Sequence, residues 1–249
     1  MTDLTAQFYS EVQSRLERLA GPNAAIDEAV RATADALDAG GVVQAFGTGH
    51  SEAFAMEIAG RAGGLIATNR IALRTLVLRG GRDVSALGGA EFERDPSVGE
   101  NLLALFDVQP HDIFMIASNS GVNGSILGVA LAAKARGHKV IAVTSLDHTM
   151  KVTPKHPSGK RLSEVADIVI DNLAPFGDST MQLEGGIGVG AVSSITAAFI
   201  AQRITIGVAE TIRQRGKKPP VYLSANIPGG DEHNRALEDL YGDRIRREA

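Results

Sequence analysis

Two short stretches rich in glycine and serine carry the residue types that could bind an anion. Residues 47–51 read GTGHS and residues 118–125 read SNSGVNGS, and each lies between an apolar, strand-like run and a helical pattern. Where a strand passes into a helix, backbone N–H groups are unpaired and the helix dipole favours negative charge. Without a lysine, these stretches suit one small phosphate better than a triphosphate. We expect the binding residues to be Gly47, Gly49, His50, Ser51, Ser118, Asn119, Ser120, Gly121 and Ser125.

Nucleotide binding and simple helix capping are the alternatives to this interpretation. A dinucleotide fingerprint needs a third glycine where this chain has Glu52, whose charge would repel a pyrophosphate, and the G-x-x-x-x-G-K-[ST] motif is absent. Ser51, Ser120 and Ser125 could be only helix N-caps, a position that serine often fills. For one loop alone, capping is the simpler interpretation. Two such loops in one small domain favour phosphate binding.

Carboxylates and histidines near these loops are candidates for proton transfer. An aldose–ketose isomerase needs a base that moves a proton between adjacent carbons, and a lyase acting on a sugar ether needs similar proton abstraction. Glu57 follows Ser51 by nearly two helical turns, and Glu93 and His148 lie in polar segments. Glu184 stands at the expected start of a long helix, where a carboxylate is also favourable simply as a first-turn residue. The catalytic candidates are therefore Glu57, Glu93, Glu184 and His148, although Glu57 and Glu93 also have a surface interpretation.

Strands and helices alternate along most of the chain. Strands are expected at 41–46, 112–118, 139–145, 166–172 and 219–225, with weaker candidates at 65–69 and 73–79. Helices are expected within 4–20 and 22–37 and at 51–62, 101–106, 125–135, 185–212 and beyond residue 231. This alternation predicts an α/β fold with a doubly wound, mostly parallel sheet over residues 41–249. An N-terminal helical pair, residues 1–40, is expected to form part of the same unit. The two loops would then meet at a switch-point crevice.

The composition limits the classes of partner and cofactor. The 249 residues carry a net charge of −4, so no general field attracts nucleic acid or an anionic membrane. The absence of cysteine excludes disulfides, thiolate nucleophiles and cysteine-ligated zinc, and it fits a reducing cytoplasm. The N-terminus does not read as a signal peptide. Polar residues interrupt the apolar segment 185–212, which predicts a buried or subunit-facing helix rather than a membrane span. We expect a cytoplasmic protein without nucleic-acid or membrane partners.

Three motifs resemble the SIS (sugar isomerase) domain, which binds phosphosugars. They are FGTGHS, IASNSG and KVIAVTS, each followed or preceded by its helix. The likeness continues through TSLDHT, APFGDSTMQLEG and PPVYLSANIPGGDEHN to a family of bacterial SIS-domain proteins. That family is related to phosphoheptose isomerase and N-acetylmuramic acid 6-phosphate etherase. The resemblance implies a flavodoxin-like three-layer sandwich. It also implies phosphate-binding positions at Ser51, Ser118 and Ser120, with Ser125 one turn further.

The chain also departs from its relatives. Phosphoheptose isomerases carry a His and a Glu of a metal site along the helix after the first serine, where this sequence has Glu57 and Arg61. We therefore expect no metal and no other cofactor. We expect no helix-turn-helix module like that of SIS-domain transcriptional regulators. The N-terminal helices resemble those that pair subunits in the small isomerases, which implies a homodimer or homotetramer. The expected function is to bind and isomerise a phosphorylated sugar. A lyase or etherase acting on an amino-sugar phosphate and a non-catalytic phosphosugar sensor are the alternatives.

Overall fold

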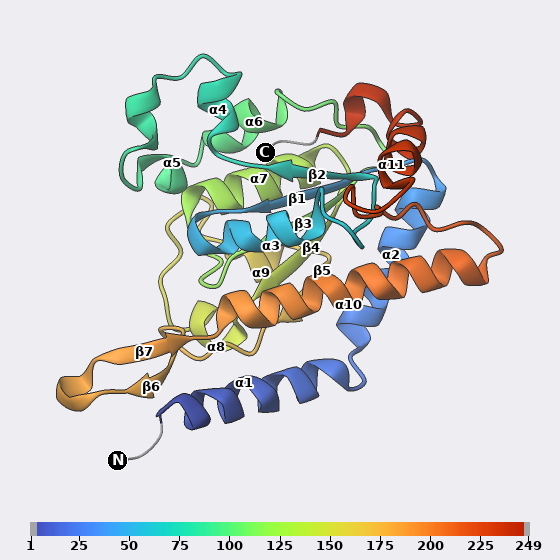
Figure 1. Ribbon diagram of the computed structural model, residues 1–249. Helices are drawn as coiled ribbons and strands as arrows, with labels where there is room; N and C mark the ends of the chain where they lie inside the picture. The colour runs from blue at the N-terminus through green and yellow to red at the C-terminus, as the bar shows by residue number, and fades with distance from the viewer. Residues whose placement is uncertain (1–3, 247–249) are drawn as a thin grey trace.

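Five strands form one parallel sheet at the centre of the molecule, in the order β2-β1-β3-β4-β5 (Figure 1). The computed structural model describes residues 4–246. Phe46 of β1 lies opposite Ile71 of β2 and Ile116 of β3. The chain continues from β1 to one side of the sheet and from β3 to the other, and ligands bind at such a reversal in open α/β sheets. The strands are β1 (Val43–Gly47), β2 (Thr68–Ile71), β3 (Ile113–Ala117), β4 (Lys139–Thr144) and β5 (Ile168–Asp171).

A separate hydrophobic layer covers each face of the sheet. Side chains alternate along a strand, so Ile113 and Met115 join one core cluster while Phe114 and Ile116 join the other. The first cluster is covered by α2 (Ala24–Asp38), α3 (Glu52–Ile58) and α10 (Ser193–Gln214). The second is covered mainly by α6 (Val98–Leu103) and α7 (Gly124–Ala135). The predicted doubly wound, three-layer α/β fold is confirmed.

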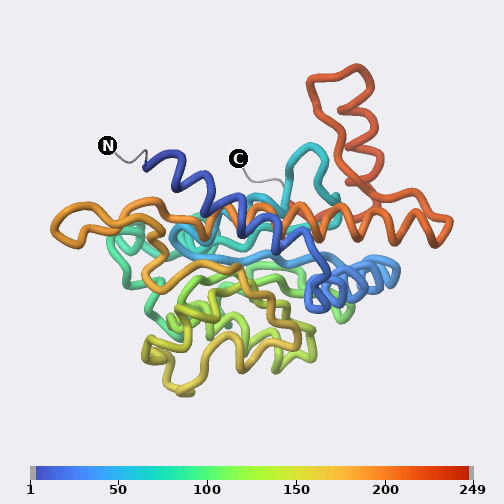
Figure 2. Tube along the Cα trace, turned by 90° about the horizontal axis from the view of Figure 1, so that it is seen from below, coloured from blue at the N-terminus to red at the C-terminus, as the bar shows by residue number. Residues whose placement is uncertain are grey.

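The N-terminal helical pair is also present. Helix α1 (Leu4–Ala20) ends just before Pro22, and the side chain of Asn23 caps α2 by accepting a hydrogen bond from the backbone N of Ile26 at 3.1 Å. Both helices pack against α10, and α1 runs beside the amino-terminal part of that helix (Figures 1 and 2). Residues 1–3 lie outside the described residues. The assignment of 1–40 and 41–249 to one unit stays a prediction.

Two strand predictions are wrong, the weaker one at 73–79 and the one at 219–225. Residues 73–79 contain the short helix α4 (Thr75–Leu78), because only Thr75 and Leu76 are buried in the core and one helical turn suffices for that. Residues 219–225 form no strand in the described chain, where Val221 makes one isolated antiparallel bridge with Leu65. The candidate at 65–69 is shifted toward its carboxyl end and becomes β2.

The long helix begins later than predicted. Residues 179–191 form an antiparallel hairpin, β6 (Ser179–Gln182) and β7 (Gly188–Ala191), and α10 starts at Ser193. Gly185 and Gly186 take φ values of +80° and +77°, which prevent an α-helix from running through this point. Glu184 therefore lies at the tip of the hairpin and is not a first-turn residue of α10. By length and composition α10 could cross a membrane, but 44% of its apolar 18-residue stretch is buried inside the fold.

The remaining elements are short. The helix predicted at 51–62 stops at Ile58, and the helix expected beyond 231 is α11. The segment between α4 and α6 holds one 3-10 turn and α5. The bounds of these helices are α5 (Glu91–Arg94), α8 (Leu146–Thr149), α9 (Leu162–Val165) and α11 (Gly230–Glu238). The 3-10 turns span Gly49–Ser51, Val84–Leu87, Glu184–Gly186 and Gly242–Arg244.

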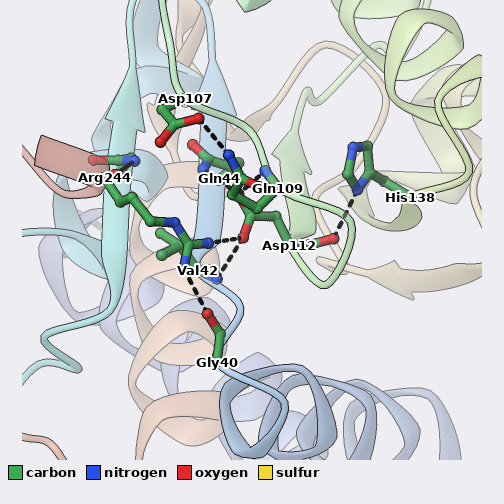
Figure 3. A network of polar contacts seen from close by, with 9 residues as sticks. Gly40, Val42, Gln44, Asp107, Gln109, Asp112, His138 and Arg244 are labelled. Carbon is green, nitrogen blue, oxygen red and sulfur yellow. Dashed lines mark hydrogen bonds and ion pairs between the residues drawn. The ribbon is translucent and has the colours of Figure 1, made fainter. Parts of the chain in front are cut away.

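A buried carboxylate joins the amino-terminal edge of the sheet to the C-terminal segment (Figure 3). The side chain of Asp112 is 0% exposed and accepts hydrogen bonds from the backbone N of Val42 at 2.8 Å and from Gln44 at 2.9 Å. Arg244 pairs with the same carboxylate at 2.7 Å and donates to the carbonyl of Gly40 at 2.7 Å. The last described residues thus anchor the sheet at the edge opposite the two glycine-rich loops.

Candidate functional site

The first glycine-rich loop leaves β1 and turns at once into α3. A Cβ atom on Gly47 would lie 2.2 Å from the backbone oxygen of Ser51, so only glycine lets the strand end so close to this turn. Gly49 has a φ of +55°, in the left-handed region that favours glycine. Within the described chain, the hydroxyl of Ser51 makes no capping hydrogen bond at the start of α3. Capping therefore does not explain this serine.

The second loop is held in shape by its own hydrogen bonds. The Oγ of Ser118 accepts a hydrogen bond from the backbone N of Gly121 at 3.0 Å, and Ser118 is only 6% exposed. Its hydroxyl proton stays available, because a hydroxyl can accept and donate at the same time. Gly121 has a φ of +62°, and a Cβ there would lie 3.2 Å from the hydroxyl of Thr144. Glycine at 121 thus lets the loop fold against β4.

The carboxyl ends of β1 and β3 bring the two loops to one pocket with an empty volume of about 260 Å³. Four elements supply its polar side chains: the first loop, the second loop, the end of β5 and the start of α10. These side chains are His50, Ser51, Ser118, Asn119, Asn172, Ser193 and Ser194. In the described structure, neither lysine nor arginine lines this pocket, so hydroxyls and amides would have to bind any anion.

Asn172 fixes the orientation of the Asn119 amide. The Oδ1 of Asn172 accepts a hydrogen bond from the backbone N of Ala174 at 3.0 Å, so its amide nitrogen faces the second loop. That nitrogen donates to the Oδ1 of Asn119 at 3.1 Å. With its oxygen engaged, Asn119 has its NH2 group left to donate to a ligand. Asn172 is 3% exposed, and it therefore sets a donor, rather than an acceptor, at this side of the pocket.

Glu93 lies between the two loops. Its Oε1 accepts a hydrogen bond from Asn123 of the second loop at 2.5 Å, and its Oε2 is 4.0 Å from the position of a Cβ on Gly49. Glu93 does not line the described pocket between the loops, but it lines a separate hollow beside the first loop, with an empty volume of about 650 Å³. The ion pair of Glu52 with Arg74, 2.7 Å long, lies in the same hollow.

Two of the serines predicted to bind phosphate, Ser120 and Ser125, do not line the described pocket. The hydroxyl of Ser125 is buried and donates to the carbonyl of Glu93 at 2.8 Å, so it anchors α5 and does not line the pocket. Ser120 is partly exposed and does not line the described pocket either. Ser51 and Ser118, by contrast, both line it.

Glu57 and Glu184 lie apart from the pocket. Arg61 pairs with Glu57, and Gln202 of α10 donates to it at 2.6 Å, so its carboxylate joins α3 to α10. Glu184 is exposed at the tip of the hairpin. Neither residue lines the pocket in the described chain.

His148 supports a neighbouring turn. Its Nδ1 accepts a hydrogen bond from the backbone N of Gly177 at 2.9 Å, and its ring stacks on Phe176 at 5.2 Å. The adjacent Asp147 bonds to Lys151 and to the backbone N of Phe176, and these bonds hold the pKa of its carboxyl below the usual value. His148 thus holds the turn after β5 and does not line the described pocket.

Sequence patterns missed three polar residues of the pocket. Asn172 directly follows the carboxyl end of β5, at the same edge of the sheet as the two loops, and that position was the signal available in the sequence. Ser193 and Ser194 fall inside the segment predicted as continuous helix, so nothing marked them as the start of α10. In residues 4–246, no three His, Asp or Glu side chains are grouped to hold a metal ion.

Comparison with known proteins gives one consistent family. The SIS domain matches residues 7–145. A UPF0309 protein of Listeria monocytogenes is 38% identical over 240 residues, which cover 96% of this chain and 97% of that protein. The fold is similar to a phosphoheptose isomerase of Francisella tularensis (TM-score 0.57, 19% identity, 84% and 100% of the two chains). It is also similar to phosphoheptose isomerase of Neisseria gonorrhoeae (TM-score 0.55, 17% identity, 82% and 97%). The chain therefore belongs to the SIS domain family and, within it, to the UPF0309 proteins.

Proposed function

We propose that this protein binds a phosphorylated sugar in the pocket between its two glycine-rich loops and isomerises it. One observation carries the proposal: at the switch point of the sheet, Ser51, Ser118 and the Asn119 amide line a single pocket. Hydroxyl and amide donors beside the start of a helix suit one phosphate group. The similarity in fold to two phosphoheptose isomerases supports a sugar phosphate as the ligand class.

Sugar phosphates should stabilise the folded protein, whereas the matching free sugars should not. At a ligand concentration of about 100 times Kd, the stabilisation is about 2.7 kcal/mol, or roughly 5–10 °C in Tm for a chain of this size. Thermal unfolding with aldose, ketose and amino-sugar 6-phosphates measures the effect. Ser51→Ala and Ser118→Ala should reduce the shift, while Ser10→Ala, which removes an exposed hydroxyl on α1, should not. No shift with any sugar phosphate would refute the proposal.

Glu93 is the best-placed candidate for proton transfer. Of the four acid–base candidates, it is the one whose side chain bonds to a glycine-rich loop in the described structure. Loss of a general base costs about 100- to 10,000-fold in rate. Glu93→Gln should therefore abolish most turnover and leave phosphosugar binding detectable. The control Glu57→Gln, whose carboxylate bonds to α10, should keep its turnover.

Product analysis by NMR identifies the reaction class. An isomerase converts one sugar phosphate into another of the same mass. Release of a second fragment would instead identify a lyase or etherase, and binding without turnover across the panel would identify a sensor. In either case the isomerase proposal would be wrong, while the binding proposal would stand.

A further inference from the structure

Asp178 makes an unusual set of contacts where the hairpin meets the start of α10. It has a φ of +66°, one of two positive values among the described residues other than glycine. Its Oδ1 accepts hydrogen bonds from the backbone N of Val192 at 3.2 Å and of Ser193 at 2.8 Å. Its Oδ2 accepts the hydroxyl of Ser193 at 2.6 Å. Left-handed backbone at a non-glycine residue is a known feature of functional sites.

This contact fixes the polarity of the Ser193 hydroxyl. A serine hydroxyl has one proton and two lone pairs, and an ionised carboxylate only accepts hydrogen bonds. The single proton of Ser193 is thus directed to Asp178, while Ser193 lines the pocket. Only lone pairs are left for a ligand. The carboxylate of Asp178 directly behind this hydroxyl adds a negative charge that disfavours an anion at this end.

The opposite side of the pocket has the reverse polarity. The amide of Asn119 keeps its NH2 group for a ligand, because Asn172 engages its oxygen. The hydroxyl of Ser118 keeps its proton, because its oxygen accepts from the backbone of Gly121. Donors therefore gather at the second loop and an acceptor stands at the start of α10.

We infer that Ser193 is a specificity-determining residue that accepts a hydrogen bond from a hydroxyl or amino group of the sugar, with Asp178 as its positioning residue. This inference rests on the proposed phosphosugar function and adds the orientation of the ligand. The phosphate lies at Ser118 and Asn119, and the donor-bearing sugar carbons lie toward α10. Inorganic phosphate, which has no sugar end, does not depend on Ser193.

Calorimetric titration with two kinds of probe tests this orientation. The probes are inorganic phosphate and, in parallel, glucose 6-phosphate, fructose 6-phosphate and glucosamine 6-phosphate. Ser193→Ala should weaken the binding of the sugar phosphates about 10-fold, the typical effect of one lost hydrogen bond in a buried site. The affinity for inorganic phosphate should change less than about twofold. Equal weakening of both probes, or no weakening of the sugar phosphates, would overturn the inference.

Asp178→Asn gives a second test, in which the affinities for sugar phosphates and for inorganic phosphate should change in opposite directions. Asparagine tolerates the left-handed backbone, and its amide would donate to the Ser193 oxygen, which frees the hydroxyl proton for the pocket. Sugar phosphates should then bind more weakly and inorganic phosphate more tightly. Asp171→Asn removes a charge from the same segment without touching Ser193, since Asp171 bonds to the backbone of Leu146 and Leu173, and should change neither. A D178N variant that weakens both probes alike would contradict the inference. Wild-type protein that binds no probe would instead reject the proposed function itself.

Discussion

Replacing Asn172 with aspartate should weaken the binding of inorganic phosphate and sugar phosphates by about 10- to 100-fold, the range for a lost hydrogen bond to a charged group. An aspartate at 172 only accepts hydrogen bonds, so it would draw the NH2 group of Asn119 toward itself. The carbonyl oxygen of Asn119 would then face the pocket, where it repels a phosphate. Calorimetric titration of N172D measures this loss.

Asn234→Asp is the matched control for that variant. Asn234 is also buried, at 1% exposure, and it both donates to and accepts from the backbone of Leu223 at 2.9 Å. Both variants place a carboxylate in the interior and should lower the free energy of unfolding. Only N172D should lose phosphate affinity in the fraction that stays folded. If N172D binds as tightly as the wild type, the amide of Asn119 is not a phosphate donor.

Arg244→Ala should lower the free energy of unfolding by about 3–5 kcal/mol, because it leaves a buried carboxylate without its cation. Asp112 has a fully buried side chain, and Arg244 pairs with it at 2.7 Å (Figure 3). The carboxylate would keep its bonds to Val42 and Gln44, which are neutral donors. Urea denaturation followed by circular dichroism measures the change.

An exposed ion pair provides the comparison. Arg215 bonds to Asp35 and Asp38, each at 2.7 Å, on the surface between α2 and the end of α10. Arg215→Ala should lower the free energy of unfolding far less than Arg244→Ala, since water screens such exposed pairs. Equal losses in R244A and R215A would show that the C-terminal anchor contributes no more than a surface contact. Phosphate affinity should persist in folded R244A, because Asp112 lies at the other edge of the sheet.

The strongest sequence patterns predicted the fold well. The apolar runs at 41–46, 112–118, 139–145 and 166–172 became β1, β3, β4 and β5, because continuous apolar runs bounded by turns suit strands buried on both faces. The strand prediction for the apolar run at 73–79 was wrong. A short apolar segment has the same composition in a strand and in a helical turn, and only its tertiary contacts decide between them.

The site was predictable where it depends on local turns. Ser51 and Ser118 were found because glycines mark a strand-to-helix turn, and they line the pocket. Ser125 has the same local pattern, yet its hydroxyl bonds to the backbone of Glu93, 32 residues away. The spacing along the sequence contains no information on that partner.

The sequence by itself determined the α/β class and the two loops at the carboxyl edge of the sheet, because these depend on local periodicity and on glycines with fixed backbone demands. It also indicated the family, through the resemblance of its motifs to the SIS domain. Only the tertiary structure decided how the pocket is polarised. The amide of Asn119 and the hydroxyl of Ser193 take their orientation from Asn172 and Asp178. Asn172 lies 53 residues from Asn119 along the chain, and Asp178 lies 15 residues from Ser193. A hydrogen bond can be directed by any group that folding brings within about 3 Å, so its direction follows from the packing of the whole chain.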